Sequence, residues 1–410
     1  MMGSGKRQSA TVSGREDVGE TCRAKPHWPA AAGTVSFMAM TDPRVATLAD
    51  LLVNYSCALQ SGENLLLEAI DVPTEFTTAV VRAVNKAGGR PLVLIKSAVV
   101  NRALLMDATA EQWNQVADVE CAQMAKMQAY IGARGSHNVS EGSDIPADRQ
   151  KIYEQTVWKR VHHEIRVKKT RWVVLRWPSS SMAQLAEMST EAFEDFYFNV
   201  CTLDYAKMSR AMRPLQALMN RTDRVRLVSP GTDLALSIKG IPAILCDGHR
   251  NIPDGEVFTA PVRTSINGVI QYNCPTLYRG VTHTDVRLLF KDGKVIEATS
   301  SETQKLNEVL DTDAGARYVG EFAIGFNPHC TRPLKDILFD EKIAGSIHLT
   351  PGQCYDEASN GNQSDIHWDL VLRQTPEVGG GEMYFDDILI RKDGRFVLKE
   401  LEGLNPENLV

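Results

Sequence analysis

Several features that mark other protein classes are missing from this 410-residue sequence. No apolar run is long enough to cross a membrane: the most apolar stretch, residues 91–100, is short and includes Lys96, so a transmembrane helix is excluded. The eight cysteines contain no C-x-x-C pair, which argues against a disulfide framework and a structural zinc site. The net charge is only −6, so a nucleic-acid coat or a polybasic membrane anchor is not expected. We therefore expect a cytoplasmic protein with free thiols that binds neither nucleic acid nor membranes.

The motifs of several other enzyme classes are also absent. No G-x-G-x-x-G follows a predicted strand and no Walker loop occurs, so nucleotide binding is not expected. His162-His163-Glu164 lacks the H-E-x-x-H spacing that places two histidines on one helix face. Ser179-Ser180-Ser181 has no G-x-S-x-G around it, and a loop with a helix cap is the simpler interpretation.

The composition is that of a globular protein with more than one domain. Hydrophobic residues make up 43% and charged residues 23%, and the length suggests two domains. Residues 1–40 are rich in Ser, Gly, Thr and Ala, which predicts a disordered leader or a mis-assigned start. The expected domains are residues 41–222 and 223–410.

The texture of the sequence differs between the two halves. In the first, strand-like segments alternate with helical ones, which predicts an α/β domain with a mostly parallel sheet. The expected strands are 64–69, 91–95, 129–131 and 171–175, and the expected helices are 43–59, 74–86, 110–127, 146–167 and, with interruptions, 183–219. From residue 224, short strands at 225–228, 234–238, 269–272 and 286–290, hairpin turns at 291–294 and 392–395, and a helix at 301–310 predict a β-rich α+β domain.

The candidate chemistry lies in the second half, beginning with two glutamates. Pro253-Asp254-Gly255 predicts a turn that presents Glu256 at the start of a strand; the simpler alternative is a solvated glutamate on a surface turn. Glu321 lies inside the apolar run 318–328, and an ionised carboxylate is costly to bury without a partner. Either a metal or an arginine supplies that partner, or Glu321 faces solvent at a strand edge.

Two histidines and an aspartate complete the candidate set. His348 lies between Ile347 and Leu349, where a lone histidine is more often a satisfied core residue than a ligand. His367 and Asp369 project to the same face if this segment is a strand, which suits metal ligation and a simple His–Asp hydrogen bond equally well. Together with Glu256, Glu321 and nearby Glu341, these residues offer more ligands than a single zinc ion needs. The set suits two divalent ions such as Zn, Mn or Co.

Short blocks in this half carry a specific resemblance. NIPDGEVFTAP, ARYVGEFAIGFNP, LFDEKIAGSIHLTPGQCY and NQSDIHWDLV, preceded by SPGTDL at 229–234, resemble in content and order the motifs of the aminopeptidase T and aminopeptidase S family of metallo-exopeptidases. The similarity runs over about residues 50–371. It implies an α/β N-terminal domain, a β-rich C-terminal domain that carries a dinuclear metal site, and a homodimer.

The resemblance also implies roles for particular residues. The implied metal ligands are Glu256, Glu321, His348, His367 and Asp369. Tyr355 matches the family's active-site tyrosine, and Glu341 is either a further ligand or a group behind the ligands. The segment between Tyr355 and His367 is shorter than the family's loop at the substrate entrance, which leaves specificity open.

The implied function is a metal-dependent aminopeptidase that hydrolyses the N-terminal peptide bond of a peptide substrate through a water activated by two divalent ions. Glu321 or Asp369 is the expected bridging carboxylate. Tyr355 would hydrogen-bond the oxyanion, and Glu341 would carry a proton to the leaving amine.

Two alternatives belong to other functional classes. His348, His367 and Asp369 alone would make the two-histidine, one-carboxylate triad of a mononuclear iron ring-cleaving dioxygenase on the same scaffold. A metal-free binding module is the other. The presence of Glu256 and Glu321 favours the peptidase, because unneeded buried carboxylates destabilise a core.

Overall fold

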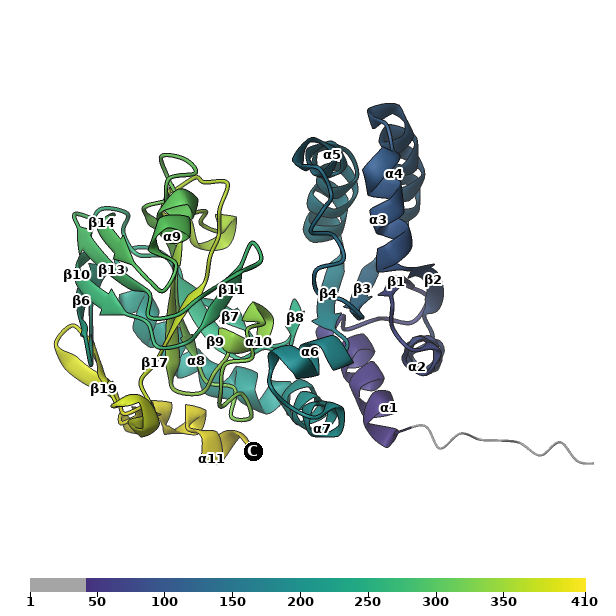
Figure 1. Cartoon of the computed structure of the whole chain (residues 1–410). Coiled ribbons are helices and arrows are strands. Elements are labelled where there is room, and N and C mark those ends of the chain that lie inside the picture. Colours follow the sequence, from purple (N-terminus) through teal and green to yellow (C-terminus); the bar gives the residue numbers. More distant parts are fainter. Residues whose placement is uncertain (1–41) are drawn as a thin grey trace, which may run out of the picture. The chain divides into compact units, whose positions relative to one another are not determined.

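A five-stranded parallel sheet, sheet A, organises the first half of the chain in this computed structural model, which describes residues 42–410 (Figure 1). Its strands follow the order β2-β1-β3-β4-β8, and all neighbours are parallel. Their bounds are β1 Asn64–Ile70, β2 Arg90–Lys96, β3 Ala129–Arg134, β4 Arg171–Arg176 and β8 Asn251–Ile252. The predicted parallel sheet is confirmed, although its last strand comes from beyond residue 222. The predicted leader lies outside the described residues.

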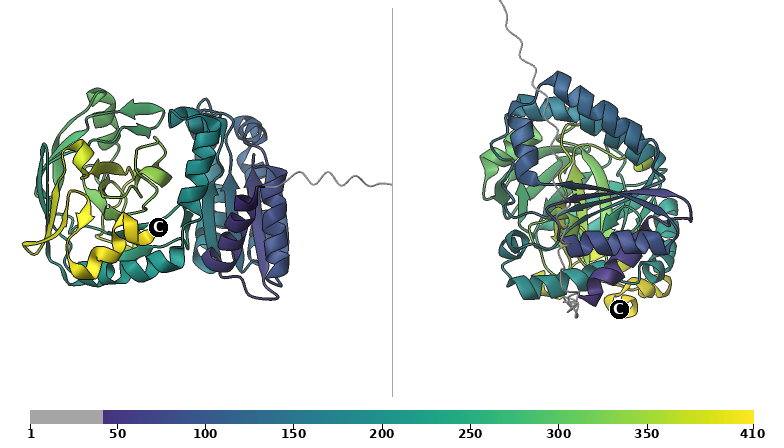
Figure 2. Two further views of the ribbon diagram at one scale, coloured as in Figure 1. Left: turned by 90° about the horizontal axis from the view of Figure 1, so that it is seen from below. Right: turned by 90° about the vertical axis from the view of Figure 1, so that its right-hand side faces the viewer.

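Helices cover both faces of sheet A (Figure 2). They are α1 Pro43–Asp50, η1 Leu51–Ser56, α2 Thr74–Lys86, α3 Ala98–Asp107, α4 Ala110–Met124, α5 Ala147–Tyr153, η2 Glu154–Val167, α6 Ser180–Leu185 and α7 Thr190–Cys201. The next helix, α8 Tyr205–Arg221, packs instead against the second half of the chain. Asp42 caps α1, because its carboxylate accepts a hydrogen bond from the backbone N–H of Arg44 while Pro43 occupies the first turn. The sequence pattern did not predict α3, since none of its residues is buried and it has no apolar stripe.

Alternation along β1 explains why sheet A needs helices on both sides. Leu65 and Leu67 pack into the main hydrophobic core, whereas Leu66, between them, packs into a separate cluster with Trp113 and Val161. Successive side chains of a strand point to opposite faces, so an almost wholly apolar strand must be covered twice.

The second half is dominated by antiparallel sheets. Sheet B follows the order β14-β13-β10-β6-β5-β18-β19-β20. Its strands are β5 Arg224–Ser229, β6 Thr232–Ser237, β10 Asn267–Gln271, β13 Arg287–Lys291, β14 Lys294–Thr299, β18 Glu382–Phe385, β19 Ile388–Lys392 and β20 Arg395–Phe396. The two predicted hairpin turns join β13 to β14 and β19 to β20, with positive φ at Asp292-Gly293 and Asp393-Gly394.

Sheet C is a smaller antiparallel sheet of order β17-β16-β15-β9-β7. Its strands are β7 Ile244–Cys246, β9 Glu256–Thr259, β15 Val319–Gly325, β16 Ser346–Pro351 and β17 Leu370–Arg373. All seven residues of the central strand β15 are buried. Phe322 and Ile324 point into the main core, so Glu321 and Ala323 belong to the opposite face.

Short elements complete the chain. They are the strand pair β11 Thr276–Tyr278 and β12 Val281–His283, the helices α9 Thr303–Leu310, α10 Ile337–Asp340 and α11 Pro406–Leu409, and the 3₁₀ turns η3 Asp356–Ala358, η4 Pro376–Val378 and η5 Lys399–Leu404. The helix predicted at 301–310 corresponds to α9.

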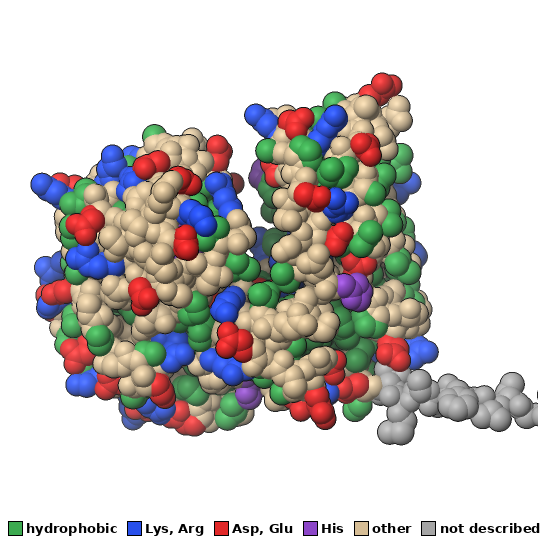
Figure 3. All heavy atoms as spheres, viewed as in Figure 1, with side chains coloured by type: hydrophobic (Ala, Val, Ile, Leu, Met, Phe, Trp, Pro, Cys, Tyr) green, Lys and Arg blue, Asp and Glu red, His purple; other side chains and the backbone are tan. Residues whose placement is uncertain are grey.

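Residues 42–410 form one compact unit, and its main hydrophobic core extends from Val45 to Leu409. The domain boundary expected at residue 222 stays a prediction. The seven cysteines within the described residues are free, and no helix among those residues is long and apolar enough to span a membrane. Acidic and basic side chains are interspersed on the face shown in Figure 3.

Gly255, between β8 and β9, is required by its backbone conformation. Its φ of +131° lies in a region that L side chains rarely adopt, and an added Cβ would lie 3.1 Å from Cβ of Asn327. We expect Gly255→Ala to lower the free energy of unfolding by about 2–4 kcal/mol through strain and overpacking. Urea unfolding measures this.

Gly240→Ala is the matched control. Gly240 also has a positive φ, +74°, but it is exposed and an added Cβ would meet nothing within 4 Å. Its substitution should cost only the left-handed backbone penalty of about 1 kcal/mol. Equal losses for the two variants would contradict the close packing of Gly255.

Candidate metal centre

One face of sheet C carries three of the predicted site residues. Glu256 opens β9, Glu321 lies on β15 and His348 lies on β16. The strand register pairs Gly325 with Glu256 and Ala323 with His348, and directly opposed residues share a face. Glu256, Glu321 and His348 are only 4%, 3% and 1% exposed. The solvated alternatives for both glutamates are therefore wrong.

His367 and Asp369 join this face from the segment that leads into β17. Trp368, between them, turns the other way: its ring stacks on Tyr278 with centroids 4.5 Å apart, and its Nε1 donates to Thr276 Oγ1 at 3.2 Å. His367 Nε2 lies 3.3 Å from both Asp369 Oδ1 and Glu321 Oε2. The structure thus brings together all five residues that the sequence predicts as ligands.

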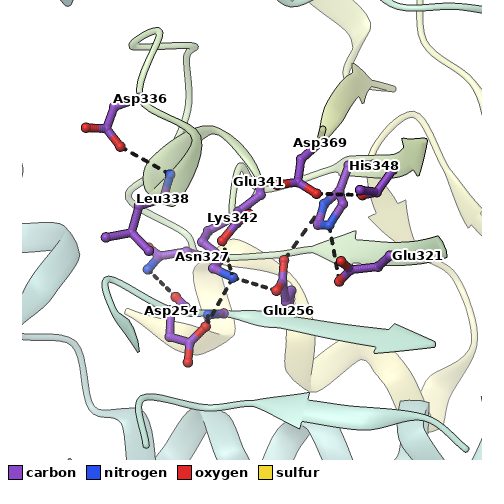
Figure 4. Close-up of polar contacts among 12 residues, drawn as sticks. Asp254, Glu256, Glu321, Asn327, Asp336, Leu338, Glu341, Lys342, His348 and Asp369 are labelled. Carbon is purple, nitrogen blue, oxygen red and sulfur yellow. Dashed lines mark hydrogen bonds and ion pairs between the residues drawn. The ribbon is translucent and has the colours of Figure 1, made fainter. Parts of the chain in front are cut away.

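The predicted site residues form two overlapping groups of donors, all labelled in Figure 4, and a third group of Cys246, Asp254 and Glu256 adjoins them through Glu256. Glu321, His348 and Asp369 form one group, and Glu256, Glu341 and His348 form the other. Within each group the ligating atoms lie within 4.8 Å of one another. His348 belongs to both because its Nε2 lies 3.5 Å from Glu321 Oε1 and its Nδ1 lies 3.8 Å from Glu256 Oε2.

Unpaired donor atoms show that these residues fit a metal. Both ring nitrogens of His348 and Oε2 of Glu256 are buried without a hydrogen-bond partner among the described residues. Buried polar atoms are normally paired, and leaving them unpaired is costly. Carboxylate oxygens and imidazole nitrogens are the donors that Zn, Mn and Co accept. The interpretation of His348 as a satisfied core histidine is wrong for this reason.

Neighbouring backbone and hydroxyl groups orient the ligands. His367 Nδ1 lies 2.8 Å from the backbone carbonyl of Gln353, which can only accept a hydrogen bond, so Nε2 is left free to ligate. Thr350 Oγ1 donates to Asp369 Oδ1 at 2.5 Å. Thr350 and Gln353 lie in the block LTPGQCY that the sequence analysis noted only for Tyr355.

The charges in this cluster perturb one another strongly. Burial alone would raise the pKa of Glu321, but the charges of the neighbouring His348 and His367 imidazoles hold it below its usual value. Burial would lower the pKa of His348, but Glu321 and Glu256 raise it to about 9. In the same way, His367 and the Thr350 hydroxyl outweigh burial and hold the pKa of Asp369 below its usual range.

Lys342 is a buried cation that the sequence analysis did not single out. It is fully buried, and its Nζ lies 2.5 Å from Glu256 Oε1, 2.7 Å from Glu341 Oε1 and 3.4 Å from Asp254 Oδ1. Burial disfavours the ammonium, but these carboxylates keep the pKa of Lys342 well above its usual value. Within the D-E-K triplet it is indistinguishable in sequence from a solvated lysine.

Glu341 belongs to one donor group, and Tyr355 borders the cluster. Burial, reinforced by Glu256 and opposed by Lys342, raises the pKa of Glu341 to about 8. The ring of Tyr355 lies between His367 and Phe258, with centroid distances of 4.9 and 5.4 Å, and the residue is 45% exposed. Tyr355 therefore stands where the ligand cluster meets solvent.

Comparisons with known proteins agree with this geometry. The model of the family described as thermophilic metalloprotease (M29) matches residues 41–396. Aminopeptidase T of Thermus thermophilus is 33% identical over 194 residues, which cover 40% of this chain and 47% of that relative. The matched segment thus spans about half of that protein.

Solved structures extend the likeness in fold to nearly the whole chain. AmpT from Thermus thermophilus superposes with a TM-score of 0.72 at 21% identity, covering 87% of this chain and 99% of that one. The 2,5-dihydroxypyridine dioxygenase from Pseudomonas putida KT2440 gives 0.57 at 12% identity, with coverages of 87% and 98%. The fold is thus shared by proteins of different chemistry, whereas the family model matches most of this sequence. The chain belongs to the thermophilic metalloprotease (M29) family.

Proposed function

We propose that this protein is a metal-dependent aminopeptidase that hydrolyses the N-terminal peptide bond of peptides with a free N-terminus. The observation that carries the proposal is the buried donor cluster on sheet C, in which His348 and Glu256 present unpaired ligating atoms. Membership of a metalloprotease family and similarity to aminopeptidase T support it. The proposal extends to a homodimer, as the family resemblance implies, and to a cytoplasmic location, as the scattered, unpaired cysteines of the sequence suggest.

Charge balance favours two divalent ions. Five carboxylates lie in this network: Asp254, Glu256, Glu321, Glu341 and Asp369. When ionised they carry five negative charges, of which Lys342 offsets one. Two divalent cations offset the remaining four, whereas a single cation would leave a buried charge of −2, which is costly in a protein interior. The two donor groups that share His348 provide a place for each ion.

Bound Zn, Mn or Co would polarise the scissile carbonyl and lower the pKa of a coordinated water. The chain's own residues do the rest. Glu321 faces both imidazoles and is suited to bridge the two donor groups, while Asp369 is fixed by Thr350. Tyr355, at the solvent edge, is placed to donate a hydrogen bond to the oxyanion. Glu341 is suited to accept a proton and pass it to the leaving amine, because burial raises its pKa to about 8.

The test of the function is metal-dependent hydrolysis of unblocked amino-acid anilides and dipeptides. The protein is stripped with chelator and reloaded in turn with Zn, Mn, Co or Fe(II). We expect activity with Zn, Mn or Co at about two ions per chain, and none on N-acetylated substrates. If one iron is held and oxygen is consumed with a hydroxypyridine, the dioxygenase that would use His348, His367 and Asp369 replaces the peptidase.

Glu321→Gln tests the proposed bridging ligand. A neutral amide cannot bridge two cations, so we expect activity to be abolished and the metal content to fall below that of the wild type. Metal analysis by mass spectrometry and the anilide assay measure these effects. Glu68→Gln is the matched control, because Glu68 is also buried but lies on sheet A, and it should keep its metal. A fully active Glu321→Gln enzyme would overturn the assignment.

Tyr355→Phe separates catalysis from metal binding. Loss of one oxyanion donor should lower kcat by about 10²–10³-fold while KM changes little and the metal content stays that of the wild type. Tyr384→Phe, on sheet B, removes a hydroxyl that contacts only Glu382 and should leave kcat unchanged. An unchanged kcat in Tyr355→Phe would remove this residue from the mechanism.

A further inference from the structure

The contacts of Lys342 suggest a function beyond that of a buried ion-pair partner. Three carboxylates lie within ion-pair distance of its ammonium group, which has no hydrogen-bond partner among the described residues. Two of them, Glu256 and Glu341, belong with His348 to a single donor group. Among the described residues, no ion pair joins Lys342 to the other donor group, of Glu321, His348 and Asp369. Lys342 thus touches one half of the proposed metal centre.

The two carboxylate oxygens of Glu256 have different neighbours, because only one of them contacts Lys342. Oε1 lies 2.5 Å from Lys342 Nζ, whereas Oε2 faces His348 Nδ1 at 3.8 Å and has no hydrogen-bond partner. The same ammonium contacts Oε1 of Glu341. A single buried cation therefore holds two like-charged carboxylates side by side, each with one oxygen engaged (Figure 4).

Lys342 is itself fixed from behind. Asp254, its third partner, accepts hydrogen bonds from the backbone N–H groups of Gly248 and Gly255 at 2.8 and 3.1 Å. The Asn327 side chain donates to the carbonyl of Asp254, and its backbone N–H donates to the carbonyl of Lys342. These bonds tie the D-E-K segment to the turn before β9, so the ammonium cannot shift without disturbing both.

We infer that Lys342 is a positioning residue for one of the two metal sites: it holds Glu256 so that Oε2 is free to ligate beside His348, and it keeps Glu341 next to Glu256. This inference rests on the proposed dinuclear site. The Glu321, His348 and Asp369 group does not depend on Lys342, so the two ions respond differently to its loss.

Charge and position must be separated to test this role, because removing a cation by itself would attract metal ions more strongly. The double variant Lys342→Met/Asp254→Asn removes one positive and one negative charge and leaves the formal charge of the pocket unchanged. Its matched control is Lys96→Met/Glu68→Gln on sheet A, where Lys96 Nζ lies 3.3 Å from Glu68 Oε1. Both double variants remove an ion pair between a lysine and a buried carboxylate.

The experiment titrates chelator-stripped proteins with Co(II), followed by calorimetry and by visible absorption. We expect two ions in the wild type and in the sheet A control. In Lys342→Met/Asp254→Asn, one ion should bind about 10–100-fold more weakly, the usual cost of losing a group that orients a ligand. The other ion should keep its affinity to within about threefold by the same reasoning.

Lys342→Arg tests whether another cation can restore metal binding, since arginine retains a buried positive charge with several N–H donors. It should recover most of the affinity for the second ion, and it also serves if the double variant does not fold. Unchanged or tighter binding of both ions without Lys342, equal weakening of both, or an arginine variant that loses the second ion would each overturn the inference. Fewer than two ions in the wild type would instead overturn the dinuclear site itself.

Discussion

The burial of five carboxylates around one face of sheet C is the constraint on which the rest of the site depends. Ionised carboxylates are costly to remove from water, so each needs a compensating cation or hydrogen bond. Lys342 compensates part of the charge, the His367 imidazole lies beside oxygens of Glu321 and Asp369, and the Thr350 hydroxyl donates to Asp369. What remains unpaired, above all Oε2 of Glu256 and both nitrogens of His348, defines where a cation is required.

Antiparallel pairing is what allows this concentration of charge. The candidate ligands come from segments far apart in the sequence, from Glu256 to Asp369, yet β9, β15 and β16 are direct neighbours in sheet C. Phe322 and Ile324 anchor the opposite face of β15 in the main core, so Glu321 is held rigidly toward the metal side. Packing of these side chains in the hydrophobic core therefore helps to order the site. Trp368, which lies between His367 and Asp369 in the sequence, is held by a hydrogen bond to Thr276 of β11, the strand that pairs with β12.

Local pattern predicted much of the fold but not the contacts that complete the site. Helix α2 and strand β1 were predicted closely because each has a clear period and clear ends. Helix α3 was missed because it buries nothing, and β8 because two residues carry no periodic signal. The five ligands were named from motif blocks that resemble a family. Lys342 could not be, since only the fold reveals that a lysine in a D-E-K triplet is surrounded by Asp254 and Glu256.

A second buried acidic residue shows why open donors, rather than burial, identify the metal centre. Glu68 on sheet A is 6% exposed, but the Tyr130 hydroxyl donates to one of its oxygens at 2.8 Å and Lys96 pairs with the other. Its requirements are met within the protein, so no cation is needed there. On sheet C the Lys342 ammonium takes only one oxygen of Glu256 and leaves the other facing an imidazole with no partner. The same chemical groups thus make a closed ion pair in one sheet and an incomplete coordination sphere in the other.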